Sequence, residues 1–158
     1  MSQPFTHLDA SGHARMVDVT GKQPTNRRAT AAGFVSCAPE VVALLRSGEV
    51  PKGDVLAVAR VAGIQAAKRT PELLPLAHVI GVHGVVVDLE LTDDGVAITA
   101  TVSTADRTGV EMEALTSVTV AGLAIIDMVK GIDRSTSLRE VRLLAKDGGR
   151  SGSWRADG

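Results

Sequence analysis

Hydrophobic positions are densest between residues 108 and 130, where the sequence is TGVEMEALTSVTVAGLAIIDMVK. Charged residues stand only near the two ends of this run, and the polar residues between them carry only small hydroxyl side chains. Thr108 and Glu111 have the spacing of a capping box, in which both side chains satisfy free backbone N–H groups at the start of a helix. The pattern predicts a central buried helix over residues 108–130, because its uncharged part is too short to span a membrane.

A second helical pattern covers residues 55–69. Small and apolar residues recur at helical spacing from Val55 onward, and Pro71 ends the run. Small side chains permit another helix to approach closely, and we expect that helix to be the one over residues 108–130. A shorter helix is predicted over residues 41–46, with a proline near its first turn and a glycine just beyond its end.

Alternating and β-branched residues predict four strands, at residues 30–37, 82–91, 96–103 and 138–145. A turn of the sequence TDDG joins the second and third strands into a hairpin. The order strand, helices, strand, strand, helix, strand is that of a ferredoxin-like α+β fold, an antiparallel sheet with helices packed on one face. Consecutive valines at residues 85–87 make both faces of one strand apolar, so we expect a second subunit to cover the free face.

The chain is predicted to form one folded domain. Its 158 residues are enough to bury a core without disulfides or metal. We expect an N-terminal arm over residues 1–29, because turn-forming and polar residues dominate there. The ferredoxin-like domain is predicted over residues 30–147, and a flexible C-terminal tail over residues 148–158.

Composition excludes several classes of partner. The 17 Lys and Arg residues balance 18 Asp and Glu residues, so no global charge attracts a nucleic acid or a membrane. Only Phe5, Phe34 and Trp154 are aromatic, which leaves no platform for stacking bases. Cys37 is the sole cysteine, and the first residues lack the apolar run of a secretory signal. We therefore expect a cytoplasmic protein with no nucleic-acid or membrane partner.

Acidic and basic residues at the ends of the central helix are the first candidates for chemistry. Asp127 and Lys130 share a face at its C-terminal end, where the spacing also fits an ordinary ion pair. Glu113 precedes Asp127 by fourteen residues, which is roughly 21 Å along a helix. The two carboxylates therefore cannot form one dyad within a single chain. Taken alone, this pattern favours solvated helix ends.

Other motifs are absent or ambiguous. The four histidines and Cys37 lack metal-ligand spacing, and the glycine-rich nucleotide and nucleophile motifs are missing. His78 lies in an apolar connector and fits either a core histidine or an acid–base group. Several cations stand next to loops and helix ends, where Lys and Arg could neutralise a polyphosphate, although each one singly fits a solvated surface. They include Lys22, Arg27, Lys52, Lys68, Lys130 and Lys146.

Longer motifs resemble one known family. They are HLD at residues 7–9, ARMVDV at 14–19, KGDV at 52–55, AGIQAAKRT at 62–70, TGVEMEAL at 108–115 and GGRSG at 148–152. Together they resemble the cyclic pyranopterin monophosphate synthases, the accessory protein C of molybdenum-cofactor biosynthesis. The resemblance extends from about residue 5 to residue 154, which is nearly the whole chain.

The resemblance implies a lyase in which the domain over residues 30–147 is catalytic. The expected reaction converts (8S)-3′,8-cyclo-7,8-dihydroguanosine 5′-triphosphate, made by an upstream radical GTP cyclase, into cyclic pyranopterin monophosphate and diphosphate. The family also implies a homohexamer, a trimer of dimers with active sites at dimer interfaces. No metal or organic cofactor is expected. An interface site would let one active centre use both ends of the central helix.

Residue roles follow from the motif match. Asp127 and Lys130 resemble the general acid–base pair, with Lys52 acting beside them and His78 also catalytic. The expected contacts to the base or sugar are Leu76, Ala77, His78, Met112 and Glu113. The expected triphosphate clamp consists of Lys22, Arg27, Lys68 and Lys146.

One functional segment departs from the family pattern. The family usually has Leu-Cys-His-Pro, whereas this chain has Leu-Ala-His-Val at residues 76–79. Ala77 lacks a thiol that would contact substrate, and Val79 frees the backbone after His78. Two hypotheses follow, an active synthase or a paralogue that binds the nucleotide or assembles with partners without full turnover.

Overall fold

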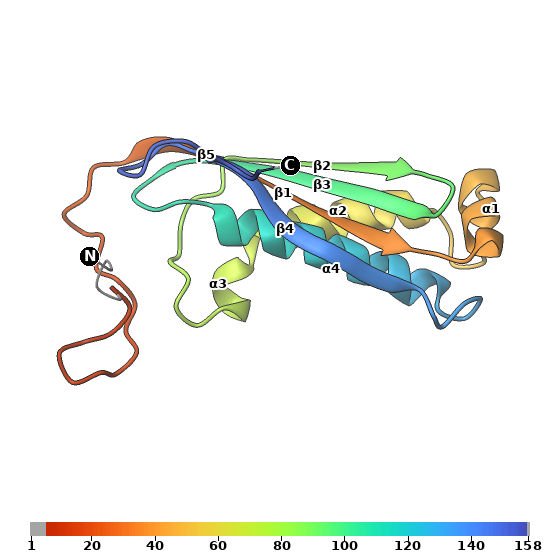
Figure 1. Cartoon of the computed structure of the whole chain (residues 1–158), viewed down its shortest axis with the longest axis horizontal. Helices are drawn as coiled ribbons and strands as arrows, with labels where there is room; N and C mark the ends of the chain where they lie inside the picture. Colours follow the sequence, from red (N-terminus) through yellow and green to blue (C-terminus); the bar gives the residue numbers. More distant parts are fainter. Residues whose placement is uncertain (1–5, 158) are drawn as a thin grey trace.

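The computed structural model describes residues 6–157, so Phe5 and the ends of the predicted arm and tail lie outside the described part. It is an α+β protein whose antiparallel sheet has the strand order β2-β3-β1-β4-β5. The long helices α2 (Val55–Lys68) and α4 (Glu111–Val129) lie side by side on one face of the sheet, and α1 (Pro39–Ser47) lies at one end of it (Figure 1). The strands are β1 (Thr25–Ser36), β2 (Gly84–Leu91), β3 (Gly95–Asp106), β4 (Ser137–Asp147) and β5 (Trp154–Arg155).

Alternation along the central strand β1 sorts its side chains between the two faces. Ala29, Ala31 and Val35 are fully buried against the helices, whereas Thr30 and Phe34 between them are half-buried on the other face. This period of two is what a strand imposes. The cover of the free face by a second subunit stays a prediction.

The central helix α4 (Glu111–Val129) is buried along one side, as predicted. Its length and composition would also suit a membrane span, but here it is the core helix beneath the sheet. The predicted capping box is wrong, because Val110 is the N-cap and no side chain caps the helix. Val110 is fully buried, so core packing places the helix start after Thr108.

Helix α2 (Val55–Lys68) begins as Asp54 accepts a hydrogen bond of 2.9 Å from the N–H of Ala57. It packs directly on α4, which confirms the predicted pairing of these helices. Gly63 makes the close approach possible, because a Cβ there would lie 3.0 Å from the carbonyl oxygen of Ser117. Helix α1 (Pro39–Ser47) also confirms its prediction, ending at Gly48 with φ +74°.

Several element boundaries differ from the predictions. Strand β1 begins at Thr25, within the expected arm, because residues 25–29 pair with the end of β3. Helix α3 (Thr70–Leu73) is a single turn around Pro71, which the sequence analysis took only as a stop. Within the predicted tail, the two residues of β5 pair with β4 and extend the sheet. The division into arm, domain and tail stays a prediction.

Candidate functional site

Three predicted catalytic residues meet where the C-terminal end of α4 approaches the loop before α2. We call Lys52, Asp127 and Lys130 the C-terminal cluster. The Lys130 Nζ lies 2.6 Å from Oδ1 of Asp127, within one turn of the helix. The Lys52 Nζ donates to the backbone carbonyl of Asp127 at 2.8 Å and lies 3.9 Å from Oδ2 of its carboxylate. All three side chains are half exposed, so a ligand can reach them.

The Asp127 carboxylate is held in its charged form. The hydrogen bond from Lys130, the positive charge of Lys130 and that of Lys52 together lower its pKa below the usual value. At neutral pH this group is therefore a proton acceptor flanked by two ammonium groups. Such a cluster can take a proton from a substrate and can also attract phosphate oxygens.

A hollow of about 600 Å³ lies at the other end of α4, and we call it the N-terminal pocket. The N-terminal arm, the connector before β2, the start of α4 and strand β4 all contribute to its walls. Six of the residues predicted to contact substrate line it: Lys22, Leu76, Ala77, His78, Met112 and Glu113. A volume of this size is typical of a small-molecule site.

His78 faces the arm across this pocket. Its Nε2 lies 2.5 Å from the backbone carbonyl oxygen of Val17. Because a carbonyl can only accept, Nε2 is the nitrogen that carries the proton and donates. The other ring nitrogen, Nδ1, is therefore the one that a neutral His78 presents for accepting a proton.

Glu113 is 3% exposed although it belongs to the first turn of α4. Burial, together with the smaller effect of the nearby charge of Glu111, raises the pKa of its carboxyl to about 7. This carboxyl therefore exchanges its proton near neutral pH, which suits general acid–base chemistry. The idea of a solvated helix end is wrong for Glu113.

The structure does not gather the four predicted clamp residues in one place. Lys22 lines the N-terminal pocket, and Lys146 lies beside it, 4.0 Å from a carboxylate oxygen of Glu111. Lys68 is exposed on the last turn of α2. Their convergence on a triphosphate stays a prediction.

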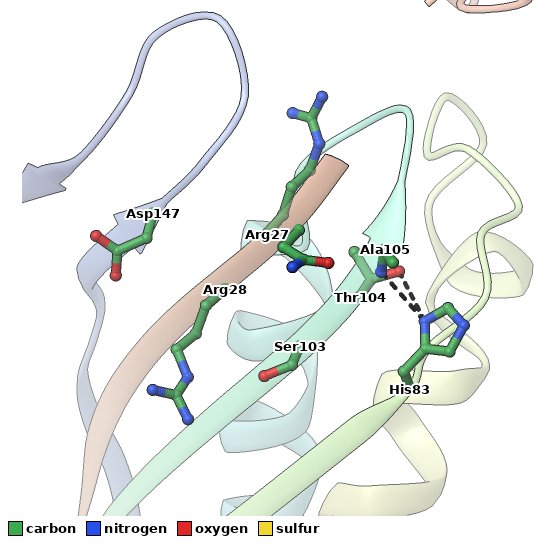
Figure 2. Close-up of a pocket in the computed structure, with 8 residues that line it drawn as sticks. Arg27, Arg28, His83, Ser103, Thr104, Ala105 and Asp147 are labelled. Atoms are coloured by element: carbon green, nitrogen blue, oxygen red, sulfur yellow. Dashed lines mark hydrogen bonds between the residues drawn. The ribbon is translucent and has the colours of Figure 1, made fainter. Parts of the chain in front are cut away.

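Arg27 is not among the residues that line the N-terminal pocket. It lines a separate hollow of about 510 Å³ together with Arg28 and His83, and Figure 2 shows its guanidinium directed away from the side chains of both. Its Nε donates to the carbonyl of Asp106 at 3.0 Å, and its Nη2 donates to the carbonyl of Arg107 at 3.2 Å. Within this chain Arg27 therefore holds backbone at the end of β3.

The C-terminal cluster and the N-terminal pocket lie at opposite ends of α4. Glu113 and Asp127 are separated by fourteen residues of continuous helix, or roughly 21 Å. A substrate cannot touch both ends within one chain. Each end alone provides part of an acid–base and phosphate site.

Comparison with known proteins shows which family this chain belongs to. The model of the MoaC family matches residues 16–149, which include the whole C-terminal cluster and most residues of the N-terminal pocket. The chain belongs to the MoaC family. The family resemblance inferred from the sequence motifs is thereby confirmed.

Relatives of this MoaC chain are similar over nearly its full length. A cyclic pyranopterin monophosphate synthase from Streptomyces coelicolor is 59% identical over 150 residues, covering 95% of this chain and 88% of that protein. The protein of the same name from Geobacter sulfurreducens is 53% identical over 156 residues, covering 97% of both chains. A third, from Chloroflexus aurantiacus, is 53% identical over 153 residues, covering 96% and 94%.

Two acidic features of the N-terminal pocket were not predicted from the sequence. Glu111 was assigned to helix capping, whereas it lines the N-terminal pocket and faces Lys146. The burial of Glu113 was also missed, although a signal was present. Glu113, Ser117 and Ala121 are four residues apart, so the carboxyl stands on the buried stripe of the helix.

Metal and thiol chemistry have little support in the described residues. Among residues 6–157, no three His, Cys, Asp or Glu side chains form a group that could hold a metal ion. Burial raises the pKa of the Cys37 thiol to about 11, and the charge of Asp133 adds to the effect. Cys37 is therefore protonated at neutral pH and is a poor nucleophile.

Proposed function

We propose that this MoaC-family protein is a cyclic pyranopterin monophosphate synthase. The observation that supports this most strongly is the identity of 52–59% to proteins of that name, over 95–97% of the chain. The proposed substrate is the cyclised dihydro-GTP described above, and the products are cyclic pyranopterin monophosphate and diphosphate. The enzyme would be a lyase that releases diphosphate.

The proposed chemistry uses side chains from both ends of α4. Ring opening and rearrangement require proton transfers, for which Asp127, His78 and Glu113 provide acid–base groups. In the cyclising step a substrate hydroxyl attacks the α-phosphorus, its proton passes to a base, and the bond to diphosphate breaks. Lys52 and Lys130 would stabilise the negative charge that builds up on the leaving diphosphate.

We further propose that the active site forms between two subunits of a homohexamer, a trimer of dimers. The separation of the C-terminal cluster from the N-terminal pocket supports this, because a two-fold axis across α4 would bring opposite ends of two copies together. Both helices of the layer also carry exposed apolar side chains. Val58 and Val61 on α2 and Leu123 on α4 are 47%, 65% and 53% exposed.

The ferredoxin-like topology and the cytoplasmic location are likewise proposals. The order β2-β3-β1-β4, with helices between β1 and β2 and between β3 and β4, supports the first. A free Cys37 and a substrate derived from GTP support the second.

The test supplies the purified protein with the cyclised dihydro-GTP and follows diphosphate and pyranopterin together. Formation of both products in equal amounts is the expected result. Binding without turnover would contradict the proposal and would favour a protein that only holds the nucleotide. Diphosphate release without pyranopterin would mean a different reaction on the same substrate.

A further inference from the structure

Two neighbouring residues at the end of β3, Asp106 and Arg107, connect the sheet to two walls of the N-terminal pocket, the connector and the arm. One wall is the connector over residues 74–83, which carries His78. The other is the N-terminal arm, which carries Lys22. Neither segment is a helix or a strand where it meets the pocket. The position of each therefore depends on individual hydrogen bonds, which are the contact of His78 with Val17 between the two walls and the bonds from the sheet.

Asp106 holds the connector. Its Oδ2 accepts a hydrogen bond of 3.1 Å from the N–H of Gly81, three residues after His78. Thr104, on the same strand, donates from its hydroxyl to the carbonyl of Gly81, so this residue is held on both sides. Hydrogen bonds from the N–H groups of Arg107 and Gly81 lower the pKa of the Asp106 carboxyl, which keeps it a charged acceptor.

Arg107 holds the arm. Its Nε donates a hydrogen bond of 2.9 Å to the backbone carbonyl of Lys22, whose side chain lines the pocket. Arg27 on β1 also stabilises the position of Asp106 and Arg107, because its guanidinium donates to the backbone carbonyls of both residues. Arg27 therefore holds the start of the turn between β3 and α4, and Arg107 in that turn holds the arm.

We propose that Asp106 and Arg107 are positioning residues that set substrate affinity by holding His78 and Lys22 at the N-terminal pocket. This inference rests on the proposed synthase function. Neither residue lines the pocket, and both act through backbone groups of other segments. Their loss should therefore weaken substrate binding more than it slows the chemical step.

Three variants of Arg107 separate positioning from direct contact with a phosphate. Arg107→Gln keeps an N–H donor without the charge, Arg107→Lys keeps both a donor and the charge, and Arg107→Ala removes both. We expect Arg107→Ala to raise KM about tenfold, the loss of roughly one hydrogen bond, with kcat within about twofold. Arg107→Gln and Arg107→Lys should both recover most of the affinity. If only Arg107→Lys recovers it, the charge acts on substrate and the proposal is wrong.

Hydrogen exchange tests Asp106 without any turnover. In Asp106→Ala, amide exchange over residues 76–83 should accelerate while the middle of α4 stays protected. Asp106→Asn provides the same test if the alanine variant folds poorly, because the amide carries no charge and only one acceptor oxygen. Unchanged exchange over residues 76–83 in both variants would refute the role of Asp106.

The control is Arg46→Ala. Arg46 belongs to α1 and pairs with Asp93 at 3.3 Å on the exposed surface. Helix α1 lies at the opposite end of the sheet from the N-terminal arm (Figure 1). Arg46→Ala should change neither KM nor exchange over residues 76–83. Absence of turnover by the unchanged protein would refute the proposed function, and the exchange measurement would still decide whether Asp106 holds the connector.

Discussion

Lys52 and Asp127 come from segments 75 residues apart, and the Lys52 Nζ donates a 2.8 Å hydrogen bond to the Asp127 carbonyl. That carbonyl belongs to the last turn of α4, where helix carbonyls have no partner in the helix and the dipole favours a cation. Lys52 is thereby held beside the Asp127 carboxylate. A free carbonyl at the end of α4 thus holds the lysine from the other segment in the C-terminal cluster.

Asp127→Asn should lower turnover by at least about a hundredfold, because the amide cannot accept a proton. Stability should change by less than about 1 kcal/mol, since the ion pair with Lys130 is half exposed. Product formation and thermal unfolding check the two effects. Asp93→Asn is the control, because Asp93 is exposed, pairs with Arg46 and belongs to neither part of the site. Turnover near that of the unchanged protein would remove Asp127 from the mechanism.

Glu113 should make stability depend on pH. Its pKa is raised from 4.5 to about 7 in the folded protein, so over this range the folded state binds more protons than the unfolded state. Stability therefore falls as pH rises from 4.5 to about 7, by up to about 3 kcal/mol, and changes little above that.

Glu113→Gln should flatten this slope, as denaturant unfolding at about pH 5 and about pH 8 will show. Glu90→Gln is the matched control, because Glu90 is exposed on β2 and its replacement should leave the slope unchanged. An equal slope in Glu113→Gln and the unchanged protein would mean that another group titrates.

The helices and strands were largely predictable because each has a clear period. The small residues of α2 predicted its contact with α4, and Gly63 against Ser117 confirms it. Sequence alone failed where tertiary packing decides a boundary. The burial of Val110 overrides the capping signal of Thr108, and pairing with β4 orders residues 154–155.

The C-terminal cluster was predictable in part, because Asp127 and Lys130 are close in sequence. The environment of the remaining site residues was not. Arg27 was assigned to the clamp by its motif, whereas its guanidinium donates to backbone carbonyls about 80 residues away. Only the folded sheet brings these groups together, so no local pattern contains the information.

Ala77→Cys should leave activity unchanged or raise it. Ala77 is half-buried in the wall of the N-terminal pocket, where a thiol is a small addition that restores the family pattern. Steady-state kinetics with the cyclised dihydro-GTP measures the effect on KM and kcat. Ala77→Ser controls for size without the thiol. A clear loss in Ala77→Cys alone would mean that the pocket has repacked around the alanine.

Mixed oligomers should reveal whether two chains share one site. In His78→Ala the N-terminal pocket is damaged, and in Asp127→Asn the C-terminal cluster is damaged, so each variant alone should be inactive. If a site takes one part from each of two subunits, random pairing of the two variants makes half of the dimers mixed. Each mixed dimer contains one intact site out of two, so about a quarter of all sites should be active. Co-expression with different affinity tags, followed by isolation of the mixed oligomer, allows this activity to be measured.

The control for this experiment mixes Asp127→Asn with Lys130→Ala. Both changes damage the C-terminal cluster, so every site in the mixture keeps a defect and activity should stay at the level of the single variants. A site formed within one chain predicts no recovery for either mixture. Recovery with His78→Ala but not with Lys130→Ala therefore requires that each site combines opposite ends of α4 from two subunits, which is the geometry that the 14-residue separation of Glu113 and Asp127 favours.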